Sequence, residues 1–264
     1  MNSIYEKAKR GIPLEDILII DCHAHIGYYG LMRLPDCFEE GILDSLDRLG
    51  IDIACIVASL SSIVADYRYG NDMVVEAVSK YPERFIGFTL CNPHYPEDMK
   101  NELDRCFAVK GIKGIKLYPA GHGCTPDYKS YHIAYETADE RKCPVLFHTW
   151  GAGDIACIDK LAGQYPGANF IMGHAGGFDV RAMEKAIDAV NRHDNVYVDL
   201  VISNTYEGNV EWFVKEMGSK KVLFGTDVPF IDPTPNFGRI AMARISDEEK
   251  RDIFGLNMKK LLDI

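Results

Sequence analysis

The stretch Ile17-Leu-Ile-Ile-Asp-Cys-His-Ala-His25 ends an apolar run with two histidines that are two positions apart. Residues i and i+2 of a β-strand lie on the same face, so this spacing points both imidazoles in one direction. Imidazole is the commonest metal ligand among the side chains. The stretch therefore predicts a strand whose end presents His23 and His25 to a single metal ion.

Three later apolar runs also end in a polar side chain. They are Pro144-Val-Leu-Phe-His148, Phe170-Ile-Met-Gly-His174 and Val222-Leu-Phe-Gly-Thr-Asp227. A single polar residue at a strand end is often only a hydrogen-bonded anchor for the next loop. Five residues of ligand type at the ends of strands are hard to explain as independent anchors, and they predict one common site.

Eight short apolar runs alternate with amphipathic segments, which is the pattern of a parallel sheet covered by helices. The predicted strands are residues 17–26, 53–59, 85–92, 111–119, 143–150, 169–175, 196–202 and 222–230. No glycine-rich dinucleotide fingerprint follows the first run, so an open doubly wound sheet is disfavoured. The length of 264 residues is close to the roughly 250 of a (β/α)₈ TIM barrel, whose chemistry takes place at the C-terminal mouth.

We therefore expect one α/β domain over residues 1–264, with residues 1–16 as a peripheral N-terminal extension. The net charge of −10 argues against nucleic acid or an anionic membrane surface as a partner, since both require a basic face. A polar N-terminus and the lack of a long apolar run predict a cytoplasmic protein with a small-molecule substrate. The oligomeric state is left open, a homo-oligomer included. Eight cysteines without a C-x-x-C pair are expected to be reduced.

Several motifs together resemble those of a known superfamily. They are Asp21-Cys-His-Ala-His25, Gly114-Ile-Lys-Leu-Tyr-Pro119, Phe147-His-Thr149, Gly173-His-Ala-Gly-Gly177, Gly225-Thr-Asp-Val-Pro229 and Gly255-Leu-Asn257. In this order they are similar to the amidohydrolase superfamily, and specifically to its amidohydrolase-2 branch. That branch contains aminocarboxymuconate semialdehyde decarboxylase and related enzymes as well as hydrolases.

The resemblance implies a division of roles among the strand-end residues. His23, His25, His148 and Asp227 would hold one divalent metal, and nitrogen and carboxylate ligands suit zinc. His174 would stay free of the metal, to orient water or polarise the substrate. Asp227 would take the proton of a metal-activated water and return it to the leaving group.

Four further residues are candidates for the surroundings of the metal. In the binuclear branches a lysine on the fourth strand is carboxylated and bridges two metals, but in the amidohydrolase-2 branch this lysine is usually not a ligand. We therefore expect one metal, with Lys116 as a contact for a substrate anion. Tyr118, two residues on, lies on the same face and stands where the branch often has histidine. Arg33 is a candidate carboxylate clamp, and Asp21 is either a hydrogen-bond partner of the metal ligands or a buried structural residue.

Three functions fit this site. The leading one is a metal-dependent hydrolase of an amide, lactone or ester, because such a reaction needs only the ion, a water molecule and a base. The second is a metal-dependent non-oxidative decarboxylase of a small carboxylated substrate, which arginines near the metal would favour. The third is a binding barrel with a vestigial site. Fold and ligands do not separate hydrolysis from decarboxylation.

Overall fold

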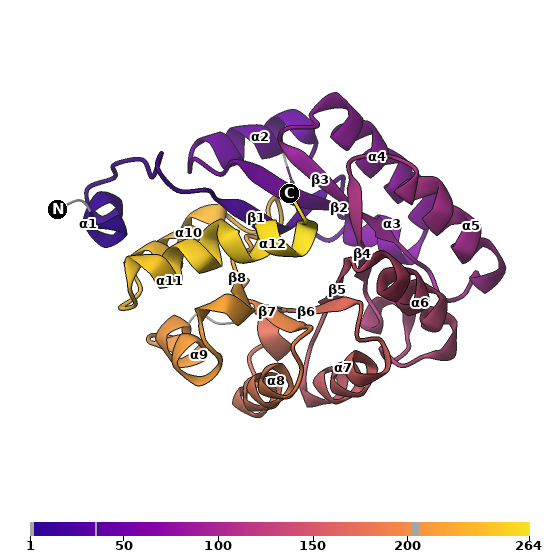
Figure 1. Ribbon diagram of the computed structural model, residues 1–264. Helices are drawn as coiled ribbons and strands as arrows, with labels where there is room; N and C mark the ends of the chain where they lie inside the picture. Colours follow the sequence, from indigo (N-terminus) through magenta and orange to yellow (C-terminus); the bar gives the residue numbers. More distant parts are fainter. Residues whose placement is uncertain (1–2, 35, 202–205) are drawn as a thin grey trace.

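The computed structural model describes residues 3–34, 36–201 and 206–264. Its eight strands are parallel and stand in chain order in one sheet, with helices around them (Figure 1). The strands are β1 (Ile20–Ile26), β2 (Ile53–Ala58), β3 (Phe85–Leu90), β4 (Ile112–Leu117), β5 (Pro144–His148), β6 (Asn169–Gly173), β7 (Val196–Asp199) and β8 (Val222–Leu223).

The helices between successive strands are α2 (Glu39–Asp47), α3 (Leu60–Val64), α4 (Tyr67–Lys80), α5 (Pro96–Phe107), α6 (His132–Arg141), α7 (Ala152–Gln164), α8 (Val180–Arg192) and α9 (Asn209–Met217). After β8 come α10 (Pro233–Met242), α11 (Asp247–Arg251), a π-helical turn (Asp252–Leu256) and α12 (Asn257–Leu262). A capping box formed by Ser246 and Glu249 begins α11.

The sheet closes into a barrel where the segment after β8 runs along β1. Three backbone hydrogen bonds join them: Cys22 N to Phe224 O at 2.9 Å, Asp227 N to His23 O at 2.7 Å, and His25 N to Val228 O at 2.6 Å. The (β/α)₈ prediction is therefore confirmed. Because β1 is hydrogen-bonded on both sides, its two histidines lie on a fixed backbone.

Strand lengths differ from the sequence prediction most clearly at the two ends of the chain. β1 begins at Ile20 instead of residue 17, and β8 ends at Leu223 instead of residue 230. Asp227 has a φ of 64°, in the left-handed region, which an extended strand cannot contain. The segment therefore leaves strand geometry while it stays hydrogen-bonded to β1. The predicted seventh strand ended at residue 202, which lies outside the described residues; β7 ends at Asp199.

The core lies inside the barrel and between the sheet and its helices. All seven residues of β1 and all six of β3 are buried, as expected for parallel strands covered on both faces. The helices contribute one apolar side each. In α8, for example, the buried residues recur at helical spacing: Ala182, Met183, Ala186, Ile187, Ala189 and Val190.

Helix α1 (Ile4–Lys9) lies at the edge of the molecule, beside α10 and α11 (Figure 1). Its first backbone amide, that of Ile4, donates to the Asp247 carboxylate at 3.2 Å. We propose that residues 1–264 form one domain, with residues 1–16 as its peripheral extension. In the part of the chain that the structure covers, no helix has both the length and the apolar character needed to cross a bilayer.

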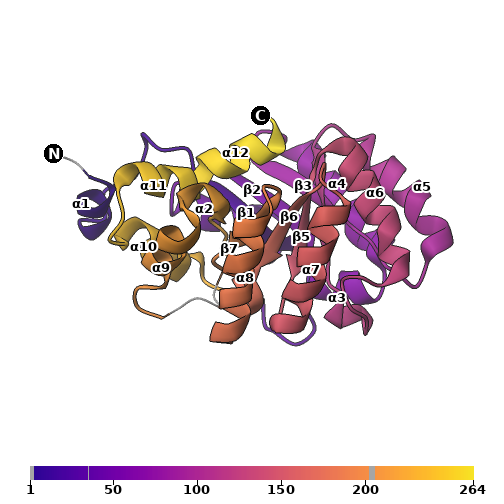
Figure 2. The ribbon, with the colours of Figure 1, turned by 60° about the horizontal axis from the view of Figure 1, so that its bottom comes forward.

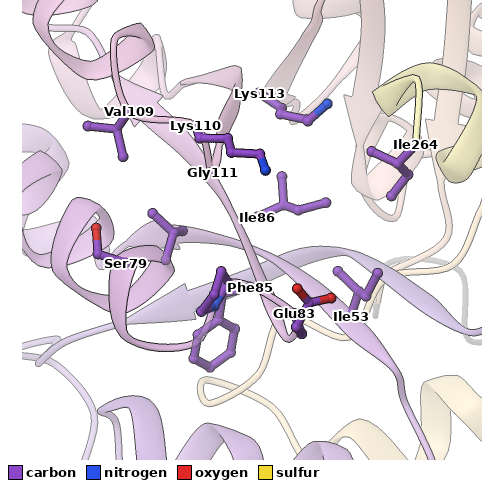
Figure 3. Close-up of a pocket in the computed structure, with 12 residues that line it drawn as sticks. Ile53, Ser79, Glu83, Phe85, Ile86, Val109, Lys110, Gly111, Lys113 and Ile264 are labelled. Atoms are coloured by element: carbon purple, nitrogen blue, oxygen red, sulfur yellow. The ribbon is translucent and has the colours of Figure 1, made fainter.

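The two ends of the barrel differ in chemistry. Figure 2 views the barrel from the side, with the C-terminus at one end and α3, which follows β2, at the other. A cavity of about 490 Å³ opens at the end where β2, β3 and β4 begin (Figure 3). Its lining includes Ile53, Phe85, Ile86, Lys110, Lys113 and Ile264, and none of the predicted site residues. The predicted site lies at the opposite end, where the strands finish.

Candidate metal centre

The two histidines of β1 meet Asp227 at the C-terminal mouth. His23, His25 and Asp227 are buried, and each offers one ligand atom within 4.8 Å of the other two. His25 Nε2 lies 3.1 Å from Asp227 Oδ1, and His23 Nε2 lies 3.8 Å from the same oxygen. Two nitrogens and one carboxylate oxygen thus converge on one small volume.

The outer nitrogens of both rings are held by hydrogen-bond acceptors. His23 Nδ1 donates to Asp199 Oδ2 at 2.9 Å, and His25 Nδ1 lies 3.3 Å from the carbonyl oxygen of Ala58. Carboxylate and carbonyl oxygens only accept, so a proton on each Nδ1 satisfies these contacts and leaves a lone pair on each Nε2. Metal-binding histidines are oriented in this way by partners of their second ring nitrogen.

Each ring nitrogen of His25 faces an oxygen that accepts hydrogen bonds, so the neutral ring needs a cation near Nε2. Burial lowers the pKa of His25, more than the neighbouring Asp227 raises it, so the neutral ring is favoured. A neutral ring has one proton for two contacts, and both its neighbours, Ala58 O and Asp227 Oδ1, are acceptors. A metal ion between Nε2 and the carboxylate removes this conflict. The residues present therefore fit a divalent cation.

Lys116, near the end of β4, is fully buried and contacts His23. Its Nζ lies 2.6 Å from His23 Nε2, so the ammonium donates to the lone pair that a metal would use. Burial lowers the pKa of Lys116 to about 8, although Asp227 and Asp199 act in the opposite direction. This contact agrees with an unprotonated Nε2 on His23. A metal ion bound to Nε2 would have to displace Lys116 from it.

His148 and His174 form a second histidine pair beside the three-residue group. His148 ends β5, and its Nδ1 lies 3.1 Å from His174 Nε2, so one proton serves both rings. Burial lowers the pKa of His148 well below its ordinary value and that of His174 to about 4. Both rings are thus neutral near pH 7. His174 Nδ1 is buried and has no hydrogen-bond partner among the described residues.

The predicted proton carrier is a strained, strongly acidic carboxylate. Burial alone would raise the pKa of Asp227, but the contact with His25 and the nearby rings of His23 and His174 hold that pKa well below its usual range. Asp227 and His174 have left-handed backbones, with φ of 64° and 65°. Such conformations cost energy and cluster at functional sites.

Gly173, the last residue of β6, gives the site room. A Cβ on Gly173 would lie 2.4 Å from the carbonyl oxygen of Phe147 and 3.2 Å from the His23 ring. A side chain at this position would clash with the backbone of β5, so only glycine fits here beside the His23 ring. The glycine before His174 is therefore part of the site's construction.

Asp199 is a central residue that the sequence analysis missed. It ends β7 with no exposed surface and accepts hydrogen bonds from His23 Nδ1 and from the backbone amides of His174 and Val201. The signal was present, because the apolar run Val196-Tyr-Val-Asp199 ends in a polar residue like the others. The predicted longer strand placed Asp199 in its interior and hid this signal.

Asp21 accepts hydrogen bonds from two backbone segments. Its carboxylate accepts from His23 N at 2.9 Å, from Thr226 N at 3.0 Å and from the Thr226 hydroxyl, so it ties β1 to the segment after β8. Burial raises its pKa to about 7, against the effect of these hydrogen bonds. Within the part of the chain that the structure describes, Asp21 forms no hydrogen bond to a histidine ring nitrogen, which favours the structural alternative.

The predicted substrate contacts are placed less centrally. Tyr118 is half-buried, with its ring 4.5 Å from that of His148. Arg33 is exposed in the loop after β1, and its contact with a substrate stays a prediction.

Aromatic side chains flank both sides of the histidines. Phe230 stacks on His25 with 4.4 Å between ring centroids, and Tyr29 contacts Phe230 at 5.3 Å. On the other side, Trp150 stacks on His148 at 5.9 Å and is half exposed. The polar cluster thus lies between apolar, flat walls.

Comparison with known proteins agrees with this picture. The family described as Amidohydrolase matches residues 20–264. The 2-amino-3-carboxymuconate-6-semialdehyde decarboxylase of Dictyostelium discoideum is 23% identical, over 75% of this chain and 66% of that protein. The gamma-resorcylate decarboxylase of Polaromonas sp. is 25% identical, over 75% of this chain and 76% of that protein. The match thus spans about two thirds to three quarters of the length of these curated relatives.

A solved structure shows the same fold. It is a dihydroxybenzoic acid decarboxylase from Polaromonas sp. with bound manganese and the inhibitor 2-nitroresorcinol. The two chains share 20% identity with a TM-score of 0.76, over 94% of this chain and 97% of that one. Because the family match covers all eight strands and the histidine cluster, the chain belongs to the amidohydrolase family, in the branch that the sequence motifs indicated.

Proposed function

We propose that the protein is a metal-dependent, non-oxidative decarboxylase of a small carboxylated substrate. The observation that carries this proposal is that the relatives found by sequence, aminocarboxymuconate semialdehyde decarboxylase and gamma-resorcylate decarboxylase, are both named for the loss of a carboxyl group. The hydrolase, which the sequence analysis put first, has no such support among these relatives. The second alternative of the sequence analysis is therefore the better one.

The reaction needs one bond to break and one proton to be delivered. The carbon–carboxylate bond breaks, carbon dioxide leaves, and the electron pair stays on the substrate carbon, which then takes up a proton. A bound divalent ion would supply positive charge to hold the substrate's oxygens and to stabilise negative charge developing on them. Asp227 and His174 are the proposed proton carriers, because Asp227 Oδ1 borders the ligand nitrogens and His174 Nδ1 is left for a bound molecule.

For the metal, we propose one ion held by His23, His25 and Asp227, with His148 as the fourth ligand. The ligand atoms of the first three residues already converge. His148 is hydrogen-bonded to His174, and this contact would have to change before His148 could bind the same ion. Imidazole and carboxylate ligands without a thiolate suit either zinc or manganese. Zinc was the expectation from the ligand types, and manganese is bound in the related decarboxylase structure.

For the substrate, we propose an unsaturated, flat carboxylate. Phe230 and Trp150 offer ring faces on either side of the histidines, and flat apolar walls favour flat ligands. Lys116 on β4 and Tyr118, directly after β4, are the proposed polar contacts for the substrate. Arg33 is the proposed carboxylate clamp from the loop after β1. Carboxylates of this kind are the substrates in the names of the relatives.

The test combines metal analysis with a substrate screen. The purified protein is assayed for zinc and manganese, then supplied with each ion and a panel of hydroxylated and aminated aromatic carboxylates, unsaturated carboxylates, amides and lactones. We expect carbon dioxide release from one of the carboxylates and none after removal of the metal. Hydrolysis of an amide or lactone without carbon dioxide release would replace the proposal by the hydrolase. A protein that binds neither ion and turns over nothing would be the vestigial barrel.

A further inference from the structure

Asp199 joins three elements of the site through one buried carboxylate. Its Oδ2 accepts from His23 Nδ1 at 2.9 Å, and its Oδ1 accepts from His174 N at 2.8 Å and from Val201 N at 3.2 Å. The residue has no exposed surface. One side chain on β7 therefore touches both a proposed metal ligand and a proposed proton carrier.

The contacts at the two nitrogens of the His23 ring specify where its proton lies. Two backbone amides, those of His174 and Val201, donate to the Asp199 carboxylate, whose oxygens therefore act as acceptors. On the far side of the ring, the Lys116 ammonium, which can only donate, lies 2.6 Å from Nε2. An acceptor at Nδ1 and a donor at Nε2 together place the proton of His23 on Nδ1. The lone pair is then on Nε2, facing the proposed metal site.

The second oxygen of Asp199 acts on a different part of the site. His174 has a left-handed backbone, as does the next residue, Ala175, with φ of 65° and 45°. These conformations are unfavourable for residues with a side chain, and surrounding contacts must hold them. The hydrogen bond from His174 N to Asp199 Oδ1 is such a contact, and it sets where the His174 ring enters the mouth.

We propose that Asp199 is the positioning residue of this site, which fixes the tautomer of His23 for metal binding and the backbone of His174 for catalysis. The role rests on the proposed metal-dependent function, and Asp199 acts through His23 and His174.

Asp21 offers a matched control within the same structure. It is also fully buried and also accepts from His23, but at the backbone amide instead of the ring, and it lies near the start of β1. A purely structural role for both carboxylates predicts similar effects of removing either charge. The positioning role predicts that only Asp199 controls the ring.

The decisive substitution is Asp199→Asn. Two backbone amides, His174 N and Val201 N, donate to Oδ1, so the amide oxygen of asparagine is held on that side. Its NH₂ group then faces His23 Nδ1 and donates to it, which drives the His23 proton to Nε2 and removes the lone pair from the metal site. Metal affinity should fall by about 10- to 100-fold, the usual effect of losing the partner of a ligand histidine.

The measurements are metal affinity and the histidine tautomer. Zinc and manganese affinities of the wild type, Asp199→Asn and Asp21→Asn are measured by competition with a chelator, with circular dichroism as a check of folding. We expect the large loss only in Asp199→Asn and wild-type affinity in Asp21→Asn. Equal losses in both variants, or none in Asp199→Asn, would overturn the proposal.

Nitrogen NMR of the metal-free wild type gives a second result that needs no Asp199 variant. The His23 signal, assigned by its absence in His23→Gln, should show a proton on Nδ1. A proton on Nε2 would refute the role of Asp199 even if Asp199→Asn does not fold. A wild type that binds neither metal ion would refute the proposed function, while the tautomer would still decide whether Asp199 fixes the ring.

Discussion

Replacing His25 by alanine should abolish the stabilisation that a metal ion gives to the folded protein. His25 Nε2 lies 3.1 Å from Asp227 Oδ1 in the group of three converging ligands, and the substitution removes this nitrogen. A ligand that binds only the native state stabilises it by about 2.7 kcal/mol when its concentration is about a hundredfold above Kd. For a chain of this size that energy raises Tm by roughly 5–11 °C.

The assay compares the gain in Tm on metal addition instead of the Tm values themselves. His25 is buried and stacks on Phe230 at 4.4 Å, so His25→Ala also loses packing, a cost on the order of 1–3 kcal/mol that is present with and without metal. Each protein is therefore melted after chelation and again with excess zinc or manganese. The gain should be near zero in His25→Ala.

Two histidines serve as controls. His193 lies outside the site, where its Nε2 is 2.9 Å from Asp159 Oδ1, so His193→Ala should keep the full gain. His174→Ala should keep most of it, because His174 is not in the proposed ligand set. An undiminished gain in His25→Ala would refute the metal centre. A loss in His174→Ala as large as that in His25→Ala would refute the division between ligand and catalytic histidines.

Three further outcomes are expected. Asp227→Asn should keep the fold and part of the metal while kcat falls by at least about 10²-fold, because an amide oxygen can contact a metal but cannot carry the proton; near-wild-type turnover in the metal-loaded variant would remove Asp227 as the proton carrier. Lys116→Met should leave the metal content near one ion per chain, because Lys116 contacts His23 without belonging to the three-residue ligand group; a fall from two ions to one would indicate a carboxylated lysine. Glu102 should contribute its full stability above its ordinary pKa and lose it as the pH falls towards its lower pKa in the fold: burial raises that pKa, but hydrogen bonds from Arg105 and Asn71 bring it below 4.5. In denaturant titrations from about pH 7 to about pH 3, the advantage of the wild type over Glu102→Gln should therefore shrink below about pH 4.5, and an advantage that stays constant would contradict the assignment.

Much of the barrel and of its site could be predicted because local patterns carry the information. Apolar runs separated by amphipathic segments indicated eight strands, and all eight are present. Their ends were predicted less well, since hydrogen bonding across the barrel decides where a strand stops. The segment after β8 was predicted to be extended to residue 230, but the left-handed backbone of Asp227 interrupts it.

The sequence by itself determined which face of β1 carries the two histidines proposed as metal ligands. The strand repeat of two residues puts His23 and His25 on one side, whatever the rest of the chain does. It also determined the ligand types, since His148, His174 and Asp227 end apolar runs. These are properties of single strands, and single strands can be interpreted from their own residues.

Only the tertiary structure decided which atoms of different strands meet. The register of β5 and β6 pairs His148 with Gly173, which brings His148 and His174 into contact, and the His174 ring also lies 5.0 Å from that of His23. The approach of β4 and β7 to β1 brings Lys116 and Asp199 to opposite nitrogens of the His23 ring. Such contacts depend on strand stagger and barrel closure, which involve residues more than 80 positions apart in the chain. Spacing along one strand contains no information about them.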